Sequence, residues 1–258
     1  MGKHFTFKEI IDQVELEKAF RLRYEVYEKS RMQFLLRPNA AKIDLDIFDL
    51  HSRHFGIFYN NNIAGYIRVV IDRKSYFNTT VASVGLENNV FEARKFIGNN
   101  YVYNGEANFP FLSYAGVPHN VKAFYIEKAQ CFSIIEASRL IVLEQFRGHK
   151  FSITLIECAI VAGMHVLGSE IGIAVLDCSA SQKRVYQLFG FQTLPNTSEY
   201  YVLNSDLTIR ALSLSLSLSL FLSLSLSLSL SDVPPKLHDK IQKMSDEFEQ
   251  TLQIKLEL

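Results

Sequence analysis

The chain has 258 residues, a formal net charge of zero and 48% hydrophobic residues, which suits one sizeable core with or without an appendage. The neutral balance gives no electrostatic support for a nucleic-acid partner. Three cysteines without metal-ligand spacing indicate free thiols in a reducing compartment, and no His or carboxylate pattern predicts a metal site. Because the first residues lack an apolar core of signal-peptide length, we expect a cytoplasmic protein.

The first half of the chain predicts a helix, an antiparallel hairpin and a mixed segment. Residues 8–29 carry apolar side chains at helical spacing. Residues 53–60 and 63–71 are apolar, strand-forming runs separated by a turn of asparagines, which predicts a hairpin. Residues 72–134 follow a mixed pattern, with a helix predicted over 121–132.

The stretch from Glu136 to Leu167 predicts a strand, a phosphate loop and a helix in succession. An apolar run at 140–143 suits a buried strand, and the polar segment 144–150 contains a glycine that lets backbone amides approach a ligand. Apolar residues then recur at helical spacing from Phe151 onward. The unpaired N–H groups and partial positive charge of a helix N-terminus suit a pyrophosphate or phosphopantetheine phosphate. Standing alone, such a turn is more often an ordinary connection between buried elements.

A second strand and a second helix follow this loop. Residues 171–177 are an apolar, strand-like run, and residues 181–189 predict a helix that stops at Gly190-Phe191. This order of elements resembles the GNAT superfamily of N-acyltransferases, whose loop pattern Gln/Arg-x-x-Gly-x-Gly/Ala is matched here except at Lys150. A lysine at this position either crowds the phosphate or adds a cation to it. The resemblance implies that the acyl donor is held by Leu143, Gln145, Arg147, Gly148, His149 and Lys150.

Four separate segments carry polar and charged residues that support a narrower resemblance. They contain Arg23, then Asp46 and Asp49, then Arg68, and finally Ser138 and Arg139. Together they are similar to the autoinducer (acyl-homoserine-lactone) synthases and still more to the long-chain N-acyl amino acid synthases, over roughly residues 17–203. The chain has no tryptophan and offers Phe34 after the first helix, which weakens homoserine lactone as the product. Charged side chains usually lie on the protein surface, and that is the alternative interpretation of these residues. The resemblance instead implies a polar cluster on the acceptor side, made of Arg23, Asp46, Asp49, Arg68, Ser138 and Arg139.

Acyl transfer to an amine needs a polarised thioester carbonyl, a neutral amine and a proton for the departing thiolate. The GNAT resemblance implies that a backbone N–H near residues 141–143 polarises the carbonyl. It also places Tyr186 where a hydroxyl protonates the leaving sulfur, and the alternative is a core tyrosine on a helix. Glu136 is the candidate base that takes the amine proton directly or through water, and its alternative is a strand-end ion pair.

The donor is either an acyl-carrier-protein phosphopantetheine thioester or an acyl-CoA, and no metal is expected. In a GNAT fold the cationic residues of the loop and of segment 181–189 would form a basic rim, which favours an acidic carrier protein, although solvated surface charges are the alternative. We predict an N-acyltransferase that moves a fatty acyl group to the amine of an amino acid or related small molecule. The alternatives are an acetyl-CoA-dependent N-acetyltransferase and a catalytically silent acyl-thioester-binding regulatory protein.

The last fifth of the chain begins with a leucine-serine alternation over residues 212–231. A CT dinucleotide tract encodes such a repeat, so we expect slippage-prone DNA rather than a structural element; a membrane span is the weaker alternative because every second residue is serine. Segment 234–258 predicts an amphipathic helix that packs on the core or on a second copy in a homodimer. The predicted fold is α/β (α+β), with a mainly antiparallel sheet flanked by helices. The predicted organisation is an acyltransferase domain at 1–204 with a substrate-facing insertion at 72–134, a repeat tract at 205–231 and a C-terminal helix at 232–258.

Overall fold

The computed structural model describes residues 2–30, 33, 36, 38–72, 76–90, 108–113, 117–168, 172–179, 182–194, 200–201, 208–216 and 233–258. The strands in these ranges are β1 (His4–Glu9), β2 (Ser52–Tyr59), β3 (Asn62–Val70), β4 (Ser133–Val142), β5 (Gly172–Ser179), β6 (Gln192–Thr193), β7 (Tyr200–Tyr201), β8 (Thr208–Leu216) and β9 (Gln253–Glu257). The helices are α1 (Gln13–Glu28), α2 (Thr79–Glu87), α3 (His119–Lys128), α4 (His149–Leu167), α5 (Lys183–Gln187) and α6 (Pro235–Thr251), with 3₁₀ turns η2 (Ile47–His51), η4 (Pro110–Leu112) and η5 (Glu144–Phe146).

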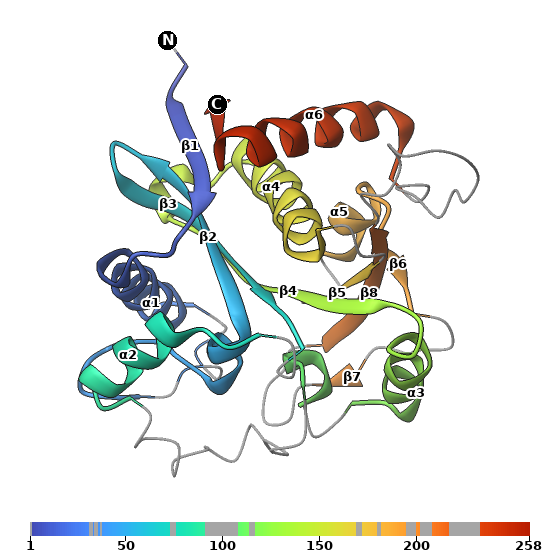
Figure 1. Ribbon diagram of the computed structural model, residues 1–258, viewed down its shortest axis with the longest axis horizontal. Helices are drawn as coiled ribbons and strands as arrows, with labels where there is room; N and C mark the ends of the chain where they lie inside the picture. Colours follow the sequence, from blue (N-terminus) through green and yellow to red (C-terminus); the bar gives the residue numbers. More distant parts are fainter. Residues whose placement is uncertain are drawn as a thin grey trace.

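One sheet joins all of these strands in the order β6-β8-β5-β4-β3-β2-β1-β9, with β7 beside β8. Strands β4 and β5 are parallel, and the other neighbouring strands are antiparallel. Helices α4 and α6 lie over one face of the sheet, and α1 and α2 lie over the other (Figure 1). The predicted mixed fold, a mainly antiparallel sheet flanked by helices, is confirmed.

Helix α4 forms the centre of the larger hydrophobic core. Its window Lys150–Leu167 is long and apolar enough to cross a membrane, yet 72% of it is buried inside the protein. Phe151, Leu155 and Ile160 pack in one cluster with inward-facing residues of the sheet. An amphipathic helix gains most of its stability from burying such a face, so α4 is a core helix that covers the sheet.

The N-terminal prediction of one helix over residues 8–29 was wrong at its start. Residues 4–9 form β1, which pairs with β2 on one side and with β9, from the far end of the chain, on the other. Helix α1 begins only at Gln13 because the side chain of Asp12 accepts a hydrogen bond from the Glu15 amide at 3.0 Å and caps the helix. Ile11, one of the apolar residues of the predicted helix, is 72% exposed.

The predicted hairpin is confirmed as β2 and β3. Asn60 and Asn61 have positive φ angles of 49° and 62°, which a two-residue hairpin turn requires and asparagine tolerates. The helix predicted over 121–132 is α3, which ends earlier, at Lys128. Much of the predicted insertion, including 91–107, and Phe34 lie outside the described residues.

The fold continues beyond the predicted domain boundary at residue 204. Strand β8 contains the start of the leucine-serine tract, pairs with β5 from Ile209 to Leu216 and buries Leu212 completely. The first residues of the repeat are therefore structural, contrary to expectation, because they extend the sheet past β5. Residues 217–231 of the tract lie outside the described part of the chain.

The C-terminal segment is a helix followed by a strand rather than one helix. In α6, Ile241 and Phe248 are fully buried in the cluster that contains α4, so its apolar face packs on the core of the same chain. Leu252 lies within the predicted helix segment but is 60% exposed. Its φ of 54° turns the chain out of the helix and into β9.

Because Ile241 is fully buried on α6, we expect Ile241→Val to lower the free energy of unfolding by about 0.5–1.5 kcal/mol. Ile126 on α3 is 62% exposed and provides the matched control, with an expected change within about 0.5 kcal/mol for Ile126→Val. Urea denaturation of both variants measures the difference. Equal changes would mean that α6 does not hold the core.

Candidate functional site

Strands β4 and β5 pair at one end and separate at the other. Their parallel register runs from Ser133 opposite Gly172 to Glu136 opposite Val175, whereas β4 continues to Val142 along β3. Parallel strands that stop pairing leave backbone groups without a neighbouring strand. A wedge therefore opens between β4 and β5 beyond Glu136.

A β-bulge in β4 lies at this wedge. Arg68 pairs with Ser138 and Tyr66 pairs with Ile141, so β4 has one more residue than β3 in the same interval. Arg139 lies in the bulge with a φ of 55°, a left-handed conformation that is uncommon for arginine. Bulges redirect side chains next to functional sites. Here the bulge turns Arg139 toward the acidic residues before η2.

Tyr186 lines the wedge on the α4 side of the sheet. It bounds a small cavity together with Ala137 and Leu140 of β4 and Leu176 of β5. The free volume of about 10 Å³ holds about one water molecule, so a thioester requires the wedge to widen. Burial raises the pKa of the Tyr186 phenol well above its ordinary value, so the hydroxyl keeps its proton near neutral pH. A protonated phenol beside the wedge can act as a general acid.

Glu136 lies at the same point of β4 but on the opposite face of the sheet. Its side chain is 2% exposed, and its Oε2 atom accepts a hydrogen bond from the Phe111 amide at 3.0 Å. Burial and the nearby Asp177 raise the pKa of the Glu136 carboxyl well above its usual range. A carboxylate with a raised pKa holds a proton more tightly, which suits a base working near neutral pH.

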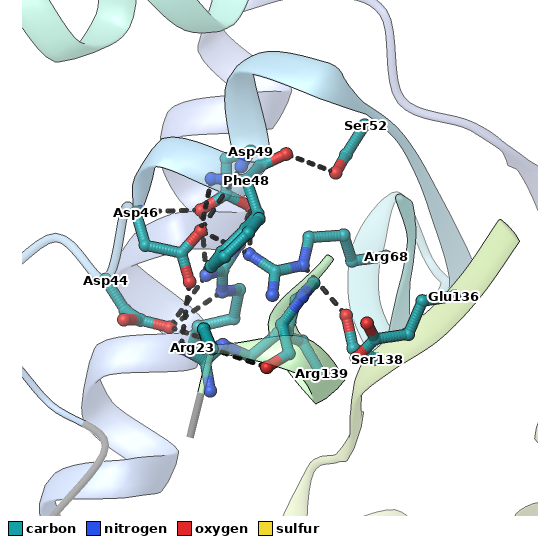
Figure 2. A network of polar contacts seen from close by, with 12 residues as sticks. Arg23, Asp44, Asp46, Phe48, Asp49, Ser52, Arg68, Glu136, Ser138 and Arg139 are labelled. Carbon is teal, nitrogen blue, oxygen red and sulfur yellow. Dashed lines mark hydrogen bonds and ion pairs between the residues drawn. The ribbon is translucent and has the colours of Figure 1, made fainter. Parts of the chain in front are cut away.

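The predicted acceptor-side residues come together in one buried network on the Glu136 face of the sheet (Figure 2). The Arg23 guanidinium on α1 donates to both Asp49 carboxylate oxygens, at 2.6 and 3.1 Å, and to Asp44 at 2.9 Å. Arg68 on β3 donates to Asp46 at 2.7 Å and to the Ser138 hydroxyl at 2.9 Å. This cluster thus links the first helix to β3 and β4.

Arg139 completes the network from the bulge, with its Nη2 atom 3.1 Å from Asp46 and its Nε atom 3.5 Å from Asp44. Burial alone raises the pKa of the Asp49 carboxyl, but Arg23 and Arg68 outweigh it and hold that pKa well below its usual range. The Asp49 carboxylate therefore stays ionised and paired. Such a network fixes the bulge and the neighbouring face of β4 in place.

The sequence reasoning missed three members of the network. Asp44 binds two of the arginines. The Tyr66 hydroxyl accepts from Arg23 at 3.2 Å and lies 2.6 Å from Nδ1 of His54. Burial lowers the pKa of His54 to about 4, so the ring is neutral near pH 7. The period-two alternation of β3 could have revealed Tyr66, because it shares the face of Arg68.

The predicted donor loop lies between β4 and α4. Gly148 immediately precedes α4, and no side chain caps the first turn of this helix. Gln145, Arg147, Gly148 and Lys150 line a hollow of about 310 Å³. Its volume falls at the lower end of ligand-sized sites, and helix N-terminal amides suit a phosphate. Leu143 directly follows β4 and His149 is the first residue of α4, so all six predicted donor residues lie along this loop and helix start.

Two details of the predicted loop need correction. The Leu143 amide donates to the Ala64 carbonyl at 3.0 Å, so it is already engaged and does not polarise a thioester. The Lys150 ammonium donates to the Glu257 carbonyl at 3.2 Å, which directs this side chain toward β9. Gly148 has an extended backbone, and a Cβ atom there would meet no atom within 4 Å. The backbone conformation at this position therefore does not require glycine. The missing side chain leaves open space above the loop.

Comparison with known proteins tests the fold. Residues 22–97 match the model of an acetyltransferase (GNAT) domain. The CoA-dependent acyl-homoserine lactone synthase BjaI, solved with SAM and isopentyl-CoA, aligns at 15% identity and a TM-score of 0.53 over 92% of this chain and 90% of BjaI. The chain has the GNAT fold.

Two other solved structures align with lower TM-scores. FeeM, an N-acyl amino acid synthase from uncultured soil microbes, aligns at 10% identity and a TM-score of 0.46, over 82% of this chain and 89% of FeeM. Escherichia coli ElaA aligns at 16% identity and a TM-score of 0.48, over 83% of this chain and 99% of ElaA. A sequence search of curated proteins found no match. The predicted GNAT-type fold is confirmed, and the domain match covers residues 22–97.

Proposed function

We propose that the protein is an N-acyltransferase that transfers a fatty acyl group from a carrier-protein or CoA thioester to the amine of an amino acid or related small molecule. One observation carries this proposal: a phenol that keeps its proton and a buried carboxylate, Tyr186 and Glu136, lie on opposite faces of the sheet at the wedge between β4 and β5. Acid and base on either side of a thioester are what aminolysis requires.

In this mechanism Glu136 removes one proton from the acceptor's ammonium group. The ammonium nitrogen cannot attack because it has no free lone pair. The nitrogen lone pair then attacks the thioester carbonyl carbon, so that a C–N bond forms and the C–S bond breaks. Tyr186 donates a proton to the departing sulfur and regains one from the new amide nitrogen. Holding both reactants in the wedge makes the reaction effectively unimolecular. The buried arginine-aspartate network supports the acceptor side by fixing the bulge of β4.

Room for a fatty chain supports a long acyl group. A hollow of about 690 Å³ lies at the paired end of β4, between Phe132, Val166 and Tyr125. Ile135 lines both this hollow and the small cavity beside Tyr186, so the two spaces meet at that side chain. A chain passing Ile135 would reach a pocket of ligand size that is lined by aromatic and aliphatic side chains together with Glu9, Arg53 and Asp72.

For the donor we propose the carrier protein, with CoA as the competing choice. Arg147 and Lys150 are exposed beside the loop, and Arg184 on α5 is exposed as well, which suits an acidic carrier surface. BjaI, in contrast, was solved with a CoA derivative, isopentyl-CoA. The predicted cytoplasmic location and a homodimer stay predictions.

Reversing both charges in Arg147→Glu/Lys150→Glu is expected to weaken binding of acyl carrier protein roughly tenfold at low salt and much less at high salt. The reason is that exposed charges are screened over about 8 Å at physiological ionic strength. Titrations with acyl carrier protein and with acyl-CoA provide the comparison, and Lys236→Glu, on an exposed part of α6, is the control. An equal loss of affinity for both donors would mean that these residues bind only the phosphate. The proposal of a carrier-protein donor would then lose its support.

An acetyl-CoA-dependent N-acetyltransferase is the second candidate, because the free volume beside Tyr186 is only about 10 Å³. Mass spectrometry of lipid extracts from cells with and without overexpression separates the candidates. A new amide-linked fatty acyl species supports the proposal. Unchanged lipids together with acetylated amines favour the second candidate, and donor binding without any turnover indicates a silent binding protein.

A further inference from the structure

A second carboxylate faces the open wedge from β5. Glu136 lies opposite Val175 in the parallel register, and partners in a register share a face of the sheet. Asp177 is two residues further along β5, so it shares this face and lies just beyond the last paired residues. Glu136 and Asp177 therefore flank the start of the wedge, on the face opposite Tyr186.

Polar and charged groups from four parts of the fold surround the Glu136 carboxyl. The Phe111 amide donates to it from η4, Arg68 and Asp46 contribute smaller charge effects from β3 and from the turn before η2, and Asp177 acts from β5. Of these charged groups, Asp177 has the largest effect on Glu136. Arg68 is itself committed to Asp46, Asp49 and Ser138. The effect of Arg68 on Glu136 is therefore smaller than the opposing effect of Asp177.

We propose that Asp177 acts with Glu136 as a carboxylate pair that receives the acceptor's ammonium group and takes up the proton it must lose. This inference rests on the proposed N-acyltransferase function and deepens it. The acceptor enters as an ammonium cation, R–NH₃⁺, and one N–H proton moves to the pair. The neutral amine then forms the C–N bond while the C–S bond breaks, and the pair later releases its proton to solvent. The substrate class is therefore a cationic primary amine.

Asp177→Asn tests the pair because it removes the charge and keeps the shape. Carbon-13 NMR titration of glutamate carboxyls should place the Glu136 midpoint at lower pH in this variant, because the neighbouring negative charge favours the protonated form. The acid limb of kcat/KM should move to lower pH by the same interval. The acceptor KM should rise roughly tenfold or more, as removal of one charge from a partly buried site predicts. Asp177→Glu should restore both pH profiles.

The kinetic probe is the best acceptor of wild type among the twenty common amino acids, ethanolamine and putrescine. Asp239→Asn, whose side chain is 95% exposed on α6, is the matched control and should leave both profiles unchanged. Thermal melting checks that each variant is folded. An unmoved Glu136 midpoint, or a midpoint that moves while the kinetic acid limb does not, overturns the proposal. If wild type forms no amide with any acceptor, the proposed function fails, and the NMR titration still decides whether the two carboxylates are paired.

Discussion

Replacing Tyr186 with phenylalanine is expected to slow the chemical step by about ten- to ten-thousand-fold and to leave donor affinity nearly unchanged, as loss of a general acid predicts. The hydroxyl lies at the wedge between β4 and β5, and burial keeps it protonated. Removing the oxygen leaves the departing sulfur without a proton donor while the surrounding packing stays the same. The effect should therefore fall on the rate of the bond-breaking step and not on binding.

Single-turnover rates with pre-bound acyl donor measure this step directly. Tyr24→Phe is the control, because Tyr24 is also a buried tyrosine but lies on α1. We expect wild-type rates for that variant. Wild-type rates for Tyr186→Phe would mean that Tyr186 only packs in the core and is not the general acid of the mechanism.

Arg68→Met is expected to lower the free energy of unfolding by about 3–5 kcal/mol, because it removes one of the two arginines that pair with each of the buried carboxylates Asp46 and Asp49. Arg68 is 1% exposed and forms ion pairs with Asp46 at 2.7 Å and with Asp49 at 3.1 Å. Methionine replaces the packing of the side chain but not its charge. The carboxylates must then be protonated or hydrated, and either change costs free energy in the folded state.

Urea denaturation provides the measurement, with Arg21→Met as the control. Arg21 pairs with Glu17 on the surface of α1, and its side chain is 46% exposed. Exposed pairs of this kind contribute about 0–1 kcal/mol. A loss for Arg68→Met no larger than for the control would contradict the view that the network fixes the bulge of β4.

Local sequence patterns predicted the elements whose contacts are close in sequence. The hairpin of β2 and β3 carries its own asparagine turn, and α4 carries its own apolar stripe. Strand β1 was missed because its partner β9 lies at the other end of the chain. Strand β8 was missed because a leucine-serine repeat gave no sign that β5 would accept it as a neighbour.

The candidate site also combines residues that the sequence could predict with a residue whose position depends on distant strand pairing. Resemblance to known synthases grouped Arg23, Asp49 and Arg68 from separate segments, and the fold brings these side chains into contact. Asp177 had no motif of its own, because its relation to Glu136 depends on the register between two parallel strands. Register of this kind is set by non-local pairing and cannot be read from one strand alone.

The central claim is tested most directly with purified protein, a fatty acyl-carrier-protein thioester or fatty acyl-CoA, and a panel of ¹⁵N-labelled amines and amino acids. Mass spectrometry of the products follows the label. We predict a fatty acyl amide that contains ¹⁵N, together with release of the free carrier or CoA thiol in equal amount, and a strongly reduced yield with Tyr186→Phe. Thioester that is bound but never converted to a labelled amide, with every donor and acceptor, would contradict the account.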